Sequence, residues 1–262
     1  MSEVPITLVM KDLDTVAPLA CGDVTVQGVA LHLDRDTPRA LERPMADPTV
    51  DAGELSLSRH VQRLSAGDRS WVALPVFVYR GFRHRCFYVR RDSELNSLEQ
   101  LRGKRLGSNE WPASGNVWTR SLLREAGVAL DSISWHLGPV DDPAEPRRPQ
   151  GPLPAYCQVI PPDRCLSNLL LDGVLDALMV PRAPRTFYES GSGVVRLFAD
   201  YRVVESEYYR RVGFYPGHHI IGVRRRVYEA YPWVLRSLYD ALEQSRLLWQ
   251  QRRRVWAECT PW

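Results

Sequence analysis

The sequence is poor in cysteine and lacks the spacings that cysteine-based structures need. Its five cysteines are an odd number, and no two of them form a C-x-x-C pair. A disulfide framework or a structural zinc site usually shows paired or closely spaced thiols. His-x-His and His-Glu-x-x-His motifs are also absent from the sequence. We therefore expect reduced thiols, no metal site and no metal cofactor.

Lysine is almost missing, because only Lys11 and Lys104 occur among 34 basic residues. Arginine makes up the rest, and its planar guanidinium suits carboxylates, although most arginines simply solvate a surface. The net charge of +3 is small, and the basic runs at 224–226 and 252–254 lack interleaved aromatic residues. This pattern argues against a nucleic-acid partner.

No long apolar run is present that would cross a membrane, which takes about 20 residues. At the start of the sequence, Glu3 precedes a short apolar run that ends at Lys11. A secretory signal instead has a basic start and a longer apolar stretch. The sequence thus predicts no export signal, no membrane partner and a cytoplasmic location.

The composition is that of a globular protein, with 44% apolar and 25% charged residues. Apolar runs typical of strands alternate with segments of helical spacing. This alternation predicts an α/β fold with mostly parallel sheets, in which ligands bind at the loops after the strands. The expected strands cover 6–10, 24–33, 71–78 (broken by Pro75), 85–91, 174–180, 194–198 and 218–224, with another starting at 105. The expected helices cover 53–64, with Ser56 or Ser58 able to cap its start, and 114–126, 165–171, 201–212 and 228–256. Residues 139–154 form a loop rich in proline and charge.

An ordered set of short motifs resembles the 4,5-dihydroxyphthalate decarboxylase family. These motifs extend over residues 6–248, and the set carries more weight than any one of them. They are ELSLS at 54–58, ALPVF at 73–77, FRH at 82–84, LRGKRLG at 101–107, DGVLDAL at 172–178, LFADY at 197–201, YYRR at 208–211, GFYPGHH at 213–219, and VYE and PWV within 227–234.

The resemblance implies a type 2 periplasmic-binding-protein-like fold, with two lobes, two crossovers and a ligand in the cleft between the lobes. We expect lobe I to comprise residues 1–91 and 199–262, and lobe II to comprise residues 92–198. The implied activity is cofactor-independent decarboxylation of a hydroxylated aromatic or related carboxylic acid. The expected partners are this small acid and, in a homo-oligomer, further copies of the chain.

Decarboxylation needs a carboxylate clamp and a general acid that protonates the ring carbon. Arg83 and His84 lie on one loop within the resemblance and suit these two roles, or else serve as a surface arginine and a loop-capping histidine. Of His218 and His219, neighbours on a strand, only one can face a cleft. His219 takes the family's histidine position, and a packed core histidine is its alternative. Glu110 is a further acid or base.

Several loop residues are candidates for substrate binding. Ser56 and Ser58 begin a helix whose free N–H groups suit an anion, although plain capping explains them equally. Trp118 walls an aromatic ligand or, more simply, packs in a helix core. Asp12, Arg80 and Arg182 complete the set, the two arginines as carboxylate clamps. No Gly-x-Ser-x-Gly elbow occurs, which argues against a nucleophilic serine.

Three functions remain open at this point. The first is the decarboxylase, in the breakdown or biosynthesis of aromatic compounds. The second is another lyase, a dehydratase or a ring-closing enzyme on the same fold, since fold alone does not fix the reaction. The third is a non-catalytic protein that binds a small acid, which the absence of an export signal disfavours.

Overall fold

The computed structural model describes residues 3–35, 39–146 and 151–259 of the chain. The chain folds into two compact units, Met1–Arg80 with Gly217–Trp262 (unit 1) and Gly81–Pro216 (unit 2). It therefore passes from one unit to the other twice. The divisions fall after Arg80 and Pro216, whereas the sequence suggested 91 and 198. They differ because the strand at 87–90 and the helix at 201–212 both pack into unit 2.

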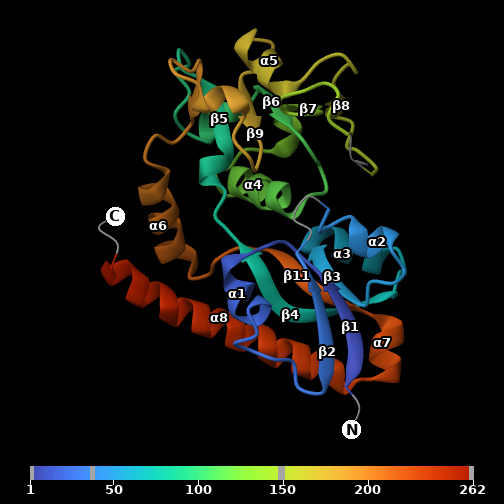
Figure 1. The fold of residues 1–262 in the computed structure, drawn as a ribbon. Coiled ribbons are helices and arrows are strands. Elements are labelled where there is room, and N and C mark those ends of the chain that lie inside the picture. Colours follow the sequence, from blue (N-terminus) through green and yellow to red (C-terminus); the bar gives the residue numbers. More distant parts are fainter. Residues whose placement is uncertain (1–2, 36–38, 147–150, 260–262) are drawn as a thin grey trace. The chain divides into compact units, whose positions relative to one another are not determined.

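Within the described residues, unit 1 contains a five-stranded mixed sheet (Figure 1). β1 pairs in parallel with β2 and β3, and β11 runs antiparallel to its neighbours β3 and β4. One reversed strand thus interrupts an otherwise parallel sheet, which refines the prediction of mostly parallel sheets. The strands, in spatial order, are β2 (Val29–Asp34), β1 (Val4–Val9), β3 (Ala52–Ser56), β11 (Gly217–Arg224) and β4 (Trp71–Arg80).

The long helix α8 closes one face of this sheet. Its buried residues Val234, Leu238, Ala241 and Leu242 share a core with apolar residues of β1, β4 and β11. They recur at three- and four-residue spacing, so they form one stripe along the helix. The helices of unit 1 are α1 (Ala17–Ala20), α2 (Arg43–Ala46), α3 (Leu57–Ser65), α7 (Arg225–Ala230) and α8 (Trp233–Cys259).

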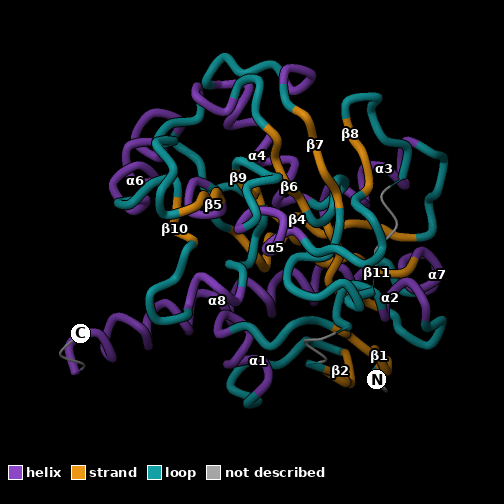
Figure 2. The backbone as a smooth tube through the Cα atoms, turned by 90° about the horizontal axis from the view of Figure 1, so that it is seen from above, coloured by secondary structure: helices purple, strands orange, loops and turns teal. Residues whose placement is uncertain are grey.

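Unit 2 is built on a six-stranded mixed sheet in the described residues. Its parallel strands β6, β7 and β8 lie side by side (Figure 2), and β5 is the reversed strand, antiparallel to both β9 and β10. In spatial order the strands are β10 (Val194–Arg196), β5 (Phe87–Arg90), β9 (Ala177–Met179), β6 (Arg105–Ser108), β7 (Ser134–Leu137) and β8 (Cys157–Val159).

Helices bury both faces of the second sheet. Phe87 and Val89 point into a core shared with α4 and α6, while Tyr88 between them joins a separate core with α5. Alternate residues of a strand face opposite sides, so a strand covered on both faces must be apolar throughout. The helices of unit 2 are α4 (Ser114–Glu125), α5 (Leu166–Leu171) and α6 (Tyr201–Val212). Short 3-10 turns in both units are η1 (Asp14–Val16), η2 (His84–Cys86), η3 (Glu99–Leu101), η4 (Leu130–Ser132) and η5 (Arg185–Tyr188).

Four local predictions were wrong. Residues 24–28 form a turn before β2, and residues 52–56 form strand β3 ahead of α3. β4 continues through Pro75, and the long C-terminal helix is divided at Tyr231 and Pro232 into α7 and α8. The predicted loop at 139–154 contains no helix or strand in its described part, and its residues 147–150 lie outside the described residues.

The five cysteines all lie in described positions and are free thiols. Among the helices of the described residues, none combines the length and the apolar character needed to cross a membrane.

Candidate active site

A buried carboxylate and a histidine meet at one edge of the sheet in unit 1. Nδ1 of His219 lies 2.5 Å from Oε1 of Glu54. The Glu54 side chain is fully buried, whereas that of His219 keeps 12% exposure. A buried carboxylate is costly unless it is hydrogen-bonded, so this bond both satisfies Glu54 and fixes the orientation of the imidazole. With Nδ1–H donated to Glu54, Nε2 is the nitrogen that remains for chemistry.

The second oxygen of Glu54 is also occupied. The backbone N–H of Lys11 donates to Glu54 Oε2 at 2.8 Å. Lys11 follows the end of β1, Glu54 belongs to β3, and β11 carries His219 opposite Ser56 of β3. The pair is therefore assembled at the carboxyl ends of parallel strands, the edge at which ligands bind in α/β sheets.

Strand β11 is irregular where it carries His219. Its pairing with β4 shifts register on both sides of His219, and Gly217 lies under the ring of Phe77. A Cβ on Gly217 would come within 2.3 Å of that ring, so only glycine fits there. Such bulges reorient side chains and are common next to functional sites. Pro75, which cannot donate to a strand neighbour, lies in the irregular part of β4.

The two adjacent histidines both lie near the ring of Tyr79 but differ in exposure. The ring of Tyr79 lies 5.2 Å from that of His219 and 5.6 Å from that of His218. His218 is fully buried, while His219 is partly exposed. Of the two rings, His219 is thus the more accessible, and its catalytic role stays a prediction.

The two predicted serines lie beside this pair. Ser56 occupies the N-cap position of α3, but its side chain makes no capping bond, and its Oγ lies 3.4 Å from Oγ of Ser58. The side chain of Ser56 therefore does not act as the cap that the sequence suggested. Ser56 is the strand partner of His219 in the β3–β11 register, and it follows Glu54 by two residues on β3.

Asp12 and Arg80, the other two predicted residues of unit 1, have different surroundings. Asp12 forms an exposed ion pair with Arg35 at 2.7 Å. Arg80 ends β4, is exposed, and places its guanidinium 5.1 Å from the centre of the Phe77 ring. Both side chains are engaged elsewhere, Asp12 with Arg35 and Arg80 with Phe77, and we leave both out of the proposed site.

In unit 2, Arg83 and Glu110 are buried around the start of α4. The guanidinium of Arg83 packs on Gly115 and donates from Nη1 to Sγ of Cys86 at 3.7 Å. Burial raises the pKa of the Cys86 thiol, which keeps it protonated. The backbone carbonyl of Glu110 accepts from Asn116 Nδ2 at 2.6 Å. Arg83 and Glu110 are thus brought to the same helix end within this unit.

His84 is surrounded by aromatic rings. Its ring centre lies 4.9 Å from that of Tyr208 and 5.9 Å from that of Phe198, and its Nδ1 has no hydrogen-bond partner among the described residues. Burial lowers the pKa of His84 to about 4. A ring that is neutral at pH 7 is a poor proton donor, so we assign His84 to packing.

This assignment predicts a pH-dependent stability. His84 is neutral in the folded protein down to about pH 4, but in the unfolded chain it takes up a proton near pH 6.5. The stability that the neutral ring of His84 gives to the folded protein is therefore complete above pH 6.5, and it is lost progressively as the pH falls toward 4. We expect urea unfolding to show His84→Phe losing roughly 2 kcal/mol less stability between pH 7 and pH 5 than the parent protein.

His32→Gln is the matched control, because it removes an exposed histidine. Its stability should follow that of the parent over the same range. Equal losses for the parent and His84→Phe would show that His84 does not resist protonation.

Trp118 and Arg182 are also placed in unit 2. Trp118 is half-buried on α4, with its ring 5.6 Å from that of Phe214. Arg182 is 69% exposed and lies 3.4 Å from a carboxylate oxygen of Asp141 and 3.7 Å from one of Glu145. Its charge is already neutralised, and we leave it out of the proposed site as well.

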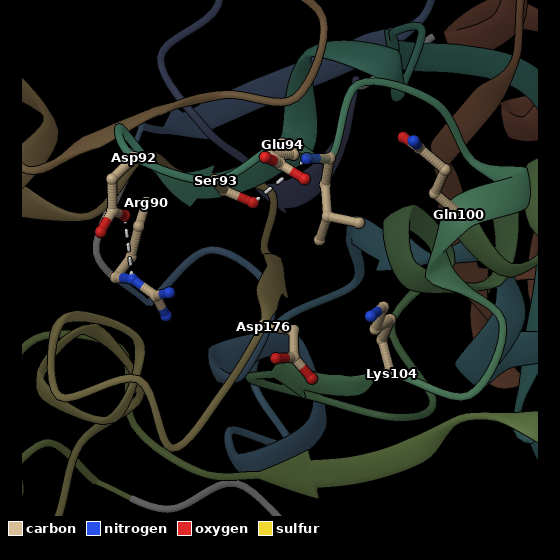
Figure 3. A pocket seen from close by; sticks show the side chains of 8 residues that line it. Arg90, Asp92, Ser93, Glu94, Gln100, Lys104 and Asp176 are labelled. Carbon is tan, nitrogen blue, oxygen red and sulfur yellow. Dashed lines mark hydrogen bonds and ion pairs between the residues drawn. The ribbon is translucent and has the colours of Figure 1, made fainter.

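A cavity of about 460 Å³ opens in unit 2 (Figure 3). Its charges are largely paired, Arg90 Nε with Asp92 Oδ1 at 3.1 Å and Asp176 with Arg105 at 2.7 Å. None of the predicted site residues lines it. Its walls are Arg90, Asp92, Ser93, Glu94, Leu95, Gln100, Lys104 and Asp176.

The sequence interpretation missed Glu54, Lys11 and Tyr79. Glu54 was hidden because residues 53–64 resembled the start of a helix. A charged residue within a run that is otherwise buried would have been the signal. Within the described residues, no group of three or more His, Cys, Asp or Glu side chains is arranged to hold a metal ion.

Two curated relatives match most of the chain. The 4,5-dihydroxyphthalate decarboxylase of Comamonas testosteroni is 35% identical over 250 residues, which cover 94% of this chain and 76% of the relative. That of Pseudomonas putida is 31% identical over 218 residues, covering 82% and 84%. No family model matches the sequence.

Solved structures share the fold at low identity. The periplasmic aliphatic sulphonate binding protein SsuA from Escherichia coli has a TM-score of 0.58 at 12% identity and covers 97% of this chain and 76% of its own. The alkanesulfonate-binding protein SsuA from Xanthomonas axonopodis pv. citri, bound to MOPS, gives 0.51 at 13%, with coverage of 97% and 76%. These structures confirm the periplasmic-binding-protein-like fold. Since two decarboxylases match more than four-fifths of its length at over 30% identity, the chain belongs to the 4,5-dihydroxyphthalate decarboxylase family.

Proposed function

We propose that this decarboxylase acts on a benzene ring bearing adjacent carboxylates and hydroxyls, and that His219 delivers the proton that replaces the departing carboxylate. The hydrogen bond between His219 Nδ1 and Glu54 Oε1 carries the proposal. Family membership supports a lyase that releases CO2 from an aromatic acid, and the names of both relatives suggest the dihydroxylated diacid as substrate.

The reaction requires one proton for each CO2 released. A ring hydroxyl pushes electron density onto the carbon that bears the carboxylate, and that carbon takes a proton from Nε2 of His219. The bond to the carboxylate then breaks, its electron pair restores the aromatic ring, and CO2 leaves. Positioned general acids accelerate such steps about 10²- to 10⁴-fold.

Glu54 has a supporting role in this scheme. Its carboxylate accepts from Nδ1 and so fixes the tautomer and the orientation of the His219 ring, with Nε2 directed away from Glu54. Because its other oxygen accepts from the Lys11 backbone, the carboxylate cannot rotate away from the ring. Glu54 is thus a positioning residue.

Other parts of the scheme remain proposals. For unit 2, we propose that the buried guanidinium of Arg83 serves as a carboxylate clamp and that Glu110 and Trp118 have substrate-binding roles. For unit 1, we propose a substrate-binding role for Ser56 and Ser58. We assign no step to a metal or an organic cofactor, and retained activity after treatment with a chelator would agree with this. The free thiols support a cytoplasmic location, and assembly into a homo-oligomer is a further proposal.

The direct test incubates the purified protein with a panel of hydroxylated aromatic mono- and diacids and measures CO2 release and product mass. We expect turnover of a dihydroxylated ortho-diacid to a monoacid lighter by one CO2. Binding without CO2 release across the panel would instead support another reaction on this fold or a binding protein.

A further inference from the structure

The ammonium group of Lys11 has no role in the reaction proposed above, although Lys11 bonds to Glu54 and lies near Tyr79, which packs on His219. Its backbone N–H donates to Glu54 Oε2 at 2.8 Å. Its ammonium lies 5.8 Å from the centre of the Tyr79 ring, and that ring lies 5.2 Å from the His219 ring. The only other lysine, Lys104, lines the cavity of unit 2.

The ammonium of Lys11 forms no ion pair with any residue that the structure describes. Its neighbour Asp12 is paired with Arg35, and both oxygens of Glu54 are occupied by Lys11 N–H and His219. The side chain is also half-buried. Removing a charged ammonium from water costs free energy, and contact with an aromatic ring offsets only part of that cost. An anionic ligand bound beside Lys11 would offset the rest.

We propose that Lys11 binds the carboxylate that stays on the ring and thereby selects diacids over monoacids. This inference rests on the proposed function. An ion pair with the departing carboxylate would oppose the reaction, because that group loses its charge as it becomes CO2. An ion pair with the retained carboxylate is equally strong before and during the reaction, so it improves binding without slowing chemistry.

The test compares the parent protein with Lys11→Met on a dihydroxylated ortho-diacid and on the monoacid with the same hydroxyls. The backbone bond to Glu54 survives this change. Loss of one charge-assisted contact should raise KM for the diacid about 10- to 100-fold. We expect kcat for the diacid to stay within about threefold and KM for the monoacid to be unchanged.

Lys104→Met is the control, since it removes an equal charge in the other unit. It should leave both KM values as they are. An unchanged diacid KM in Lys11→Met, or an equal rise for both acids, would overturn the role of Lys11 while leaving the decarboxylase intact.

Binding of unhydroxylated phthalate, measured by calorimetry, separates this inference from the reaction. Phthalate carries both carboxylates but lacks the hydroxyls that drive the proposed chemistry. Weaker phthalate binding by Lys11→Met, but not by Lys104→Met, would support the Lys11 site even if no acid in the panel were decarboxylated. Equal phthalate binding by all three proteins would count against it.

Discussion

His219→Ala is expected to lower kcat for CO2 release by about two to four orders of magnitude, the range that a general acid contributes. The effect should fall on kcat, because the proton is needed in the transition state and not for binding. CO2 release and phthalate binding, measured on the same preparations, distinguish these two effects. Activity equal to that of the parent would remove His219 from the mechanism.

Truncating His219 also removes a hydrogen-bond partner from the buried carboxylate of Glu54, so a second variant must separate loss of catalysis from loss of stability. His219→Asn restores an amide donor near the position of Nδ1 but has no group that can protonate the ring carbon. We expect it to unfold at nearly the parent's temperature and still to lack turnover. His84→Phe provides the contrast, since we expect it to retain turnover at pH 7. A loss as large as that of His219→Asn would return His84 to the mechanism.

Glu54→Gln is the second change with a large expected effect. The amide oxygen can still accept from Lys11 N–H, but the amide NH₂ must donate toward Nδ1 of His219. This arrangement makes Nδ1 an acceptor, so residue 54 no longer sets the tautomer and orientation that the His219 ring has in the parent protein. We expect kcat at pH 7 to fall on the order of a hundredfold.

The pH–rate profile shows whether Glu54 acts through His219. Because the group that faces Nδ1 is no longer a carboxylate, we expect the Glu54→Gln profile to differ in shape from that of the parent. Glu94→Gln, an exposed change in unit 2, should leave the profile in place. A uniform loss of activity with an unmoved profile would indicate that Glu54 only stabilises the fold.

The sequence predicted the elements whose signals are local. Helix α6 was expected at 201–212, as observed. In the structure, the side chain of Asp200 caps its start, and Gly213, at a φ of 72°, ends it. Strands β7 and β8 were missed. Each is only three or four residues long and is held by its neighbours, Trp135 lying opposite Leu106 on one side and Cys157 on the other. A strand of three or four residues is too short to show a recognisable apolar pattern in the sequence.

The site could be predicted only in part for a similar reason. His219 was found because a resemblance marked its position. Its partner Glu54 is 165 residues away, and nothing near Glu54 indicates that a register between β3 and β11 joins them. The Glu54–His219 pair depends on long-range strand pairing, which no local sequence pattern predicts.

The position of β11 between β3 and β4 also bears on how the protein is made. β11 is encoded after all of unit 2, yet it is the neighbour through which β4 joins the sheet of unit 1. On the ribosome, unit 2 is continuous and can fold when Pro216 has emerged, since domains generally fold as units during synthesis. Until residues 217–224 follow, β4 lacks its place in the sheet and Glu54 lacks its histidine. A product of premature termination within unit 2 would therefore lack His219, the proposed proton donor, and the Glu54–His219 pair can form only after residues 217–224 have been made.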